Sequence, residues 1–315
     1  MNFIDRFKNG WVLLGNSFTV IRANPRLLLF PVATAVLTCV MGFLFMTPIV
    51  LQTSEHRYTE AAHWKEVGSR FIILSEPTEY DLARGHKRHA EFSRQALAFG
   101  ALAYFLSMFL ATFFNVAFVH EIFDALDGRP VSVGEGIAFA LTKIKPILMW
   151  SLFAGLVGIL IKSLEEKFGF FGKMVVRSIG LAWSVASVFV IPVLVLEEHP
   201  DNPIGVVKQS ASVISKAWGE SLGGYAGLQI GGFLAAFGLF SSFALSGAAA
   251  YALGSWLVLA AGIVLGLGLT MAFSYTLGVA GQIFVCVLYR FATTGQVPAG
   301  WDPSALGQAW TPKKA

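Results

Sequence analysis

Hydrophobic and polar positions follow a pattern that occurs three times along the chain: a short amphipathic segment, then two long apolar runs. In the first segment, Trp11, Leu14 and Phe18 recur at steps of three and four residues, which places them on one face of a helix. A helix with bulky apolar residues on one face and charged residues on the other lies in the plane of a membrane surface. Asn24 should end this helix, because Pro25 disfavours helical geometry in the residue before it.

The same arrangement returns twice. Residues 131–145 form a second predicted surface helix, broken at Pro146, and residues 203–218 form a third, in which Val207 and Ile214 share a face. We expect all three surface helices to lie on the same side of the membrane.

Six apolar runs follow these segments, where a bilayer-spanning helix needs about 20 residues. They cover residues 27–51, 96–123, 147–161, 179–196, 222–245 and 251–290. Pro192 is expected to kink the fourth run, and residues 162–177 to form a charged connection before it. The sixth run is nearly twice the usual length. One long tilted helix is the favoured interpretation, and a helix broken among Gly262, Gly266 and Gly268 is the alternative.

Small residues recur at helical spacing in the last two runs. Such stripes let the backbones of membrane helices approach closely, so we expect these runs to dock on each other. The stripes are Gly223, Gly227, Gly231 and Ala235 in the fifth run, and Gly254, Gly262, Gly266, Thr270, Ser274 and Gly278 in the sixth.

Composition supports a membrane protein. Of the residues, 55% are hydrophobic and 13% are charged, and the mean hydropathy is +0.65; soluble domains carry about 25% charged residues. The predicted fold is therefore all-α: a polytopic membrane helical bundle of about six transmembrane helices in three pseudo-repeats, forming a single domain over residues 1–315.

One sizeable polar region, residues 52–95, interrupts the first pair of runs and is expected to be an extracytoplasmic loop. Trp64 and Val67 indicate a short amphipathic helix there, and residues 81–94 indicate a helical stalk.

Six spans place both termini on one side, with the surface helices. That side carries 12 Lys and Arg residues and the other carries 11, of which seven lie in the 52–95 loop. Long loops cross the membrane largely regardless of charge, and without this loop the ratio becomes 12 to 4. We therefore expect a bacterial cytoplasmic (inner) membrane protein with cytoplasmic N- and C-termini.

Three charged residues occupy equivalent places, at the ends of the second, fourth and sixth runs: Glu121, Glu197 and Arg290. Charges at this depth extend to the interface or pair with one another. Interfacial anchoring and helix-end pairing is the favoured interpretation, and a shared ion or substrate gate is the alternative. Three amides lie within runs and are expected to bond between helices: Asn115, Gln229 and Gln282.

No grouping of an acid, a base and a nucleophile is visible, and no phosphate-binding glycine loop occurs. His86 and His89 could approach each other on a helix, but cationic neighbours oppose a metal ion. Cys39 and Cys286 lie in apolar runs and are expected to be buried thiols that serve as small apolar residues rather than a disulfide. We predict no enzyme activity, no cofactor and no metal site, and dispersed basic residues predict no nucleic-acid partner.

Four stretches resemble an uncharacterised family of bacterial and archaeal multi-pass membrane proteins. They are Trp11-x-x-Leu14-x-x-Ser17-x-x-Val20-Ile21 with Leu27–Pro31, then Asp127-Gly128-x-Pro130-x-Ser132-Val133-x-Glu135-Gly136, then 210–220, and Leu288–Arg290 continuing to Pro298. Gly10 and Phe18 depart from the family pattern, which favours serine and tryptophan there. The resemblance implies the fold and leaves function open. A looser likeness, of architecture alone, is to the membrane domain that accompanies some glycerophosphodiesterases.

Two functions are therefore predicted. The first is a non-enzymatic scaffold or accessory protein that binds membrane lipid, a membrane-protein partner or a second copy of itself. The alternative is a transporter or channel for a small or lipidic solute.

Overall fold

The computed structural model describes residues 12, 15–75, 89–198, 200, 202–216, 222–301, 303 and 306; within these ranges, the side chains of 72–75, 89–91, 170–171, 216 and 222–235 are not described. The described part contains ten complete α-helices and a further helical segment over 15–23, and six of the helical segments are long and apolar enough to cross a membrane. The predicted all-α class with six spans is confirmed.

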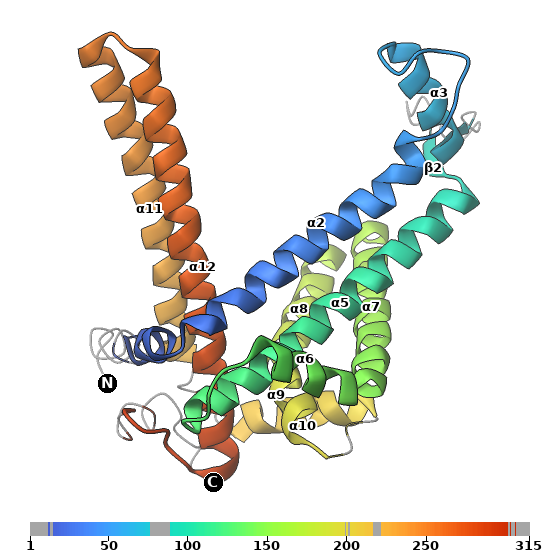
Figure 1. Cartoon of the computed structure of the whole chain (residues 1–315). Coiled ribbons are helices and arrows are strands. Elements are labelled where there is room, and N and C mark those ends of the chain that lie inside the picture. The colour runs from blue at the N-terminus through green and yellow to red at the C-terminus, as the bar shows by residue number, and fades with distance from the viewer. Residues whose placement is uncertain are drawn as a thin grey trace.

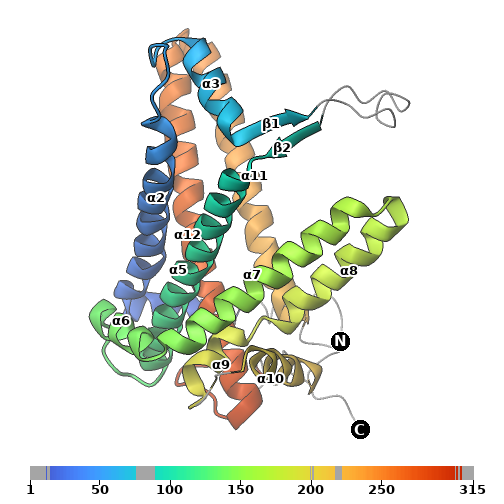
Figure 2. The same ribbon diagram turned by 90° about the vertical axis from the view of Figure 1, so that its right-hand side faces the viewer.

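The helices form three hairpins that rise from a common base (Figures 1 and 2). They are α2 (Leu29–Val50) with α5 (Arg94–Leu126), α7 (Ile144–Lys167) with α8 (Phe170–Ala186), and α11 (Leu222–Leu253) with α12 (Trp256–Thr294). The hairpins α2–α5 and α11–α12 splay apart like the arms of a V. A shorter helix precedes each hairpin and lies at the base: the helix over 15–23, α6 (Val133–Thr142) and α10 (Pro203–Lys216).

The first of these base helices ends where the sequence predicts. Asn24 is the N-cap of a short 3-10 helix, η1 (Pro25–Leu28), and Pro25 takes its first position. Proline fits there because the first N–H of a helix has no intrahelical partner. Phe18 packs against the core, whereas Trp11 lies outside the described residues.

The second unit differs from expectation at two points. The break falls at Lys143, between α6 and α7, and Pro146 lies in the first turn of α7, where it costs no hydrogen bond. The predicted charged connection over 162–177 is wrong: α7 continues to Lys167 and α8 begins at Phe170. Arg177 Nε lies 2.9 Å from Glu165 Oε1, so these charges join the two helices of the hairpin instead.

The predicted kink at Pro192 is a complete interruption. Helix α8 ends at Ala186, and α9 (Val190–Leu196) carries Pro192 as its third residue. Proline has no N–H to bond the carbonyl four residues earlier, so a continuous helix would lose a bond here. The Phe189 N–H donates instead to Ser210 Oγ on α10, at 3.0 Å.

Helix α12 is continuous, which confirms the favoured interpretation of the sixth run. Its burial explains its length. Nearly all residues from Leu277 to Tyr289 are buried in the base, whereas most residues before Leu277 are at least partly exposed. Residues 256–276 rise about 31 Å, close to the roughly 30 Å hydrocarbon thickness of a bilayer. About half of the helix therefore matches a normal span, and the remainder serves as protein core.

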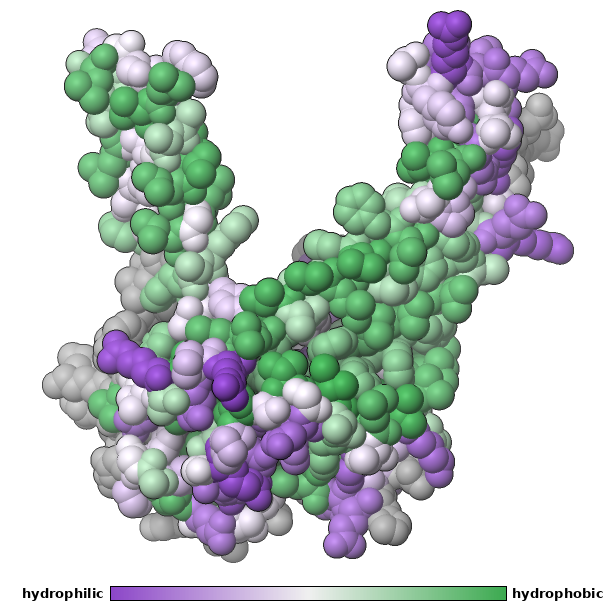
Figure 3. Space-filling view, viewed as in Figure 1, coloured by the Kyte–Doolittle hydropathy of each residue, from purple (hydrophilic) through white to green (hydrophobic). Residues whose placement is uncertain are grey.

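The hydrophobic core lies at the base, where the spans and surface helices meet. Ile122 of α5, Ile147 of α7, Leu194 of α9 and Ile283 of α12 are fully buried in one cluster. Above the base, apolar side chains cover both arms of the V (Figure 3). The α11–α12 tip carries Tyr251, 93% exposed, in place of charged residues, as expected for aromatic anchoring at a membrane interface.

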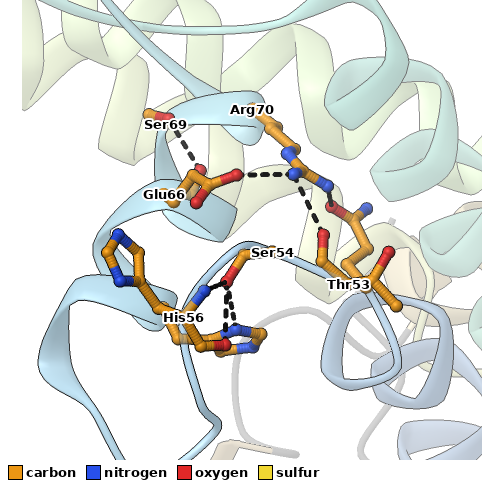
Figure 4. Close-up of polar contacts among 8 residues, drawn as sticks. Thr53, Ser54, His56, Glu66, Ser69 and Arg70 are labelled. Atoms are coloured by element: carbon orange, nitrogen blue, oxygen red, sulfur yellow. Dashed lines mark hydrogen bonds and ion pairs between the residues drawn. The ribbon is translucent and has the colours of Figure 1, made fainter.

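The tip of the α2–α5 hairpin holds the polar insertion. Helix α3 (Ala61–Phe71) is the predicted amphipathic helix, and Val67 is buried in it. Arg70 fixes α3 to the end of α2: it donates to Gln52 Oε1 at 3.2 Å and pairs with Glu66 at 2.8 Å (Figure 4).

The predicted helical stalk over 81–94 is wrong over 89–92, which form strand β2 (His89–Phe92). Strand β2 pairs antiparallel with β1 (Ile72–Ser75), and Ile72 lies opposite Phe92. His86 lies outside the described residues, and His89 lies on strand β2 instead of the expected helix. Residues 89–92 adopt a strand because their backbone pairs with β1.

Candidate functional site

Glu121 sits near the end of α5 and is 0% exposed. Its Oε2 accepts a hydrogen bond from the Ser132 N–H at 2.6 Å, and Ser132 Oγ caps the start of α6. Glu121 therefore fixes α6 against α5. Its second oxygen, Oε1, has no hydrogen-bond partner among the described residues.

Arg290 on α12 pairs with Asp127, the C-cap of α5; Arg290 Nη1 lies 2.5 Å from Asp127 Oδ1. Arg129 bonds both Asp127 and Asp124, so the acidic end of α5 meets two guanidinium groups. The turn that brings Arg129 back requires Gly128, whose φ is +74°. The sequence Asp127-Gly128-Arg129-Pro130 is typical of such a turn.

Glu197 is the C-cap of α9 and belongs to a second group of polar contacts. Gln209 of α10 donates to its carboxylate, and Lys143 Nζ donates to its backbone carbonyl at 2.5 Å. Tyr289 of α12 lies close to Glu197 and Gln209. Glu197 thereby connects α9 with both neighbouring surface segments.

The three charged residues thus all lie at the base, but no contact among the described residues joins any two of them directly. Each bonds a different neighbour, as the anchoring interpretation expects. The residues that sequence reasoning missed are Asp124, Asp127, Arg129, Lys143 and Gln209. The only signal for them was the turn at 127–130, which indicates that the chain reverses next to the α5 end.

His120, Glu121 and Asp124 each offer one ligand atom, and these atoms lie within 4.8 Å of one another. A nitrogen and two carboxylate oxygens could hold a divalent cation. Arg129 already neutralises Asp124, however, and the His120 ring stacks on Phe139 with centroids 3.9 Å apart. We interpret the group as part of the helix-end pairing.

A groove of about 640 Å³ lies where α2, α5 and α12 converge at the foot of the V. Its size is typical of small-ligand sites, which are about 300–1,000 Å³. Apolar walls include Phe30, Phe114 and Val279, and the polar lining includes Asn115 and Gln282. Two of the three amides singled out in the sequence therefore line one groove; the side chain of the third, Gln229, is not described.

The polar groups of the groove fall into two classes. Three hydroxyl groups of the groove donate to backbone carbonyls and are therefore satisfied: Thr34 donates to Phe30, Thr38 to Thr34, and Tyr275 to Leu28. The side chains of Asn115 and Gln282 are exposed to the groove and make no hydrogen bond with another described residue. The expected interhelical bonds of these two amides do not form.

These features define a class: six helices suited to crossing a bilayer, joined at one end by three surface helices, as in a multi-pass membrane protein. A family model described as "Family of unknown function (DUF6159)" matches residues 96–299, and the chain belongs to this family. The match begins after the polar insertion, so the resemblance noted over Trp11–Pro31 lies outside it. Neither the curated proteins nor the solved structures contain a match.

Proposed function

We propose that this protein is a non-enzymatic accessory or scaffold protein of the bacterial cytoplasmic membrane that engages membrane lipid. The observation that carries the proposal is the open V. Among the described residues, α11 packs chiefly on α12, and α12 meets α5, η1 and α10 toward the base. The space between the arms has apolar walls and opens sideways, which suits lipid better than an enclosed aqueous path.

Delipidation tests this role. Removing lipid from the purified chain in mild detergent is expected to lower its Tm by about 5 °C or more, since bound lipid at 100 times its Kd stabilises by about 2.7 kcal/mol. Adding phosphatidylethanolamine and phosphatidylglycerol should restore the Tm. Reconstituted vesicles should pass ions no faster than empty ones. An unchanged Tm, or clear ion conductance, would contradict the proposal.

A transporter of a lipidic solute is the second candidate, because the groove opens sideways between the arms. Movement of a fluorescent phospholipid between the leaflets of reconstituted vesicles distinguishes the two. An accessory protein leaves this rate at that of protein-free vesicles.

We further propose that the base, with both termini, faces the cytoplasm. The exposed Arg22 and Arg26 lie on the base side, in keeping with the excess of cations there once the 52–95 loop is set aside. A green fluorescent protein fused after Ala315 should fluoresce, and alkaline phosphatase inserted after Ser54 should be active. The reverse pair of results would invert the topology.

A further inference from the structure

The groove at the foot of the V presents amide groups without a protein partner at the base end of the spans. Asn115 lies six residues before Glu121, and Gln282 lies eight residues before Arg290. At 1.5 Å per residue these amides lie about 9 and 12 Å along their helices from those charged residues, on the side of the arms. An amide that is covered at the membrane interface without a hydrogen-bond partner is unfavourable. A molecule that supplies hydrogen-bond acceptors at this level would remove that cost.

Cationic groups lie next to the base end of the groove. Arg26 lies four residues before Phe30, which lines the groove. The Arg26 guanidinium donates to the Val131 carbonyl and has no carboxylate partner among the described residues. Arg22 lies near the end of the base helix over 15–23, is exposed, and makes no ion pair within the described part of the chain. Two guanidinium groups at the membrane surface attract phosphate.

Above the amides, the groove continues into the space between the arms. The surfaces of both arms are apolar (Figure 3), and the exposed apolar residues include Phe43 on α2 and Leu269 on α12. From base to tip, the described residues therefore offer cations, then amide groups, then an apolar surface. A glycerophospholipid carries phosphate, ester carbonyls and acyl chains in the same order.

We propose that the groove holds one glycerophospholipid from the base-side leaflet. Its ester carbonyls accept from Asn115 and Gln282, its phosphate lies toward Arg22 and Arg26, and its acyl chains extend between α2 and α12. This inference rests on the proposed function and assigns it a place and a ligand class. A lipid held here would brace the two arms at the point where they diverge.

Filling the groove without changing its polarity tests the site. Gly278 lines the groove, and a Cβ added there would meet nothing within 4 Å. Gly278→Leu should therefore fold and occupy the space of the lipid. Gly268→Leu is the matched control, because Gly268 lies on the same helix, is equally open and does not line the groove.

Native mass spectrometry of protein incubated with phosphatidylethanolamine and phosphatidylglycerol micelles gives the occupancy. Wild type and Gly268→Leu should retain one phospholipid per chain, and Gly278→Leu should lose it. Asn115→Leu with Gln282→Leu should lower occupancy about tenfold or more, the loss of one or two hydrogen bonds. Ser178→Leu on α8, an exposed polar residue outside the groove, should leave it unchanged.

Cys39 supplies an independent readout. It lines the groove and is exposed, whereas Cys286 is buried. Bound phospholipid should slow alkylation of Cys39 by N-ethylmaleimide in wild type and not in Gly278→Leu. Equal retention in all variants, or a lipid-free dimer in wild type, would overturn the site. Should the Tm still depend on lipid in that case, the proposed function would stand without this site.

Discussion

Gly136→Val is expected to lower the Tm of the purified protein by about 5–10 °C, because it forces α6 away from α5. A Cβ at Gly136 would lie 2.9 Å from the Ala117 carbonyl oxygen and 2.9 Å from Glu121 Cγ. The carbonyl belongs to the α5 backbone and cannot move aside. Displacing Glu121 also removes the acceptor of the Ser132 N–H, and leaving a buried group without its partner costs about 1–3 kcal/mol.

Gly134→Val is the control for this effect. Gly134 lies in the same helix, and a Cβ there would meet only Ser132 Oγ, at 3.9 Å. The two variants share the change in helix propensity, so their difference in Tm reports the packing of α6 on α5 and on Phe30 of α2, 3.1 Å from a Cβ at Gly136. Equal Tm values would show that α6 does not press on α5 as described, and that Glu121 does not fix it there.

The three repeated units could be predicted because each local signal has one physical meaning. Trp11 to Phe18 set a helical face, Asn24–Pro25 set its end, and the structure keeps that end. Pro146 misled the prediction because proline suits the first turn of a helix as well as the residue after one. The helix break falls instead at Lys143, whose side chain bonds the Glu197 carbonyl, 54 residues away in the sequence. A contact at this distance cannot be predicted from the local pattern around Pro146.

The length of the sixth run could be predicted from the sequence. Which part of it spans the membrane and which part belongs to the protein core could not. Residues before Leu277 and those after it are equally apolar, since lipid and protein core select the same side chains. Only the packing of α12 against α5, α10 and η1 distinguishes them. The groove follows from that division, which is why Asn115 and Gln282 could be identified as polar residues within spans while their common site could not.

The polar insertion shows the limit of local patterning most clearly. Residues 89–92 carry a helix-compatible sequence, yet they pair with β1, and Ser93 caps α5 through the Ala96 N–H at 3.2 Å. Backbone pairing with a distant segment overrides weak helix propensity. The helical stalk was predicted because nothing in the sequence marks Ile72 as the partner of Phe92.

The second large effect is expected at the α11–α12 hairpin, where part of the predicted small-residue stripe is in contact. A Cβ at Gly262 would lie 2.5 Å from Ser246 Cβ, and one at Gly266 would lie 2.7 Å from Ser242 Cβ. Gly262→Ala with Gly266→Ala should push the helices apart and lower the Tm by about 5 °C or more, since overpacking costs about 1–3 kcal/mol per site. Gly268→Ala, where a Cβ meets nothing, should raise stability by up to about 1 kcal/mol through helix propensity.

A compensating change separates contact from propensity. Ser246→Gly removes the side chain that a Cβ at Gly262 would strike, so adding it to Gly262→Ala should recover most of the lost Tm. Ser246→Gly alone should destabilise, because glycine weakens a helix interior. Mutual rescue of this kind arises only if the two positions touch. If the double variant were as unstable as the sum of the single variants, the close approach of α11 and α12 at Gly262 would be wrong.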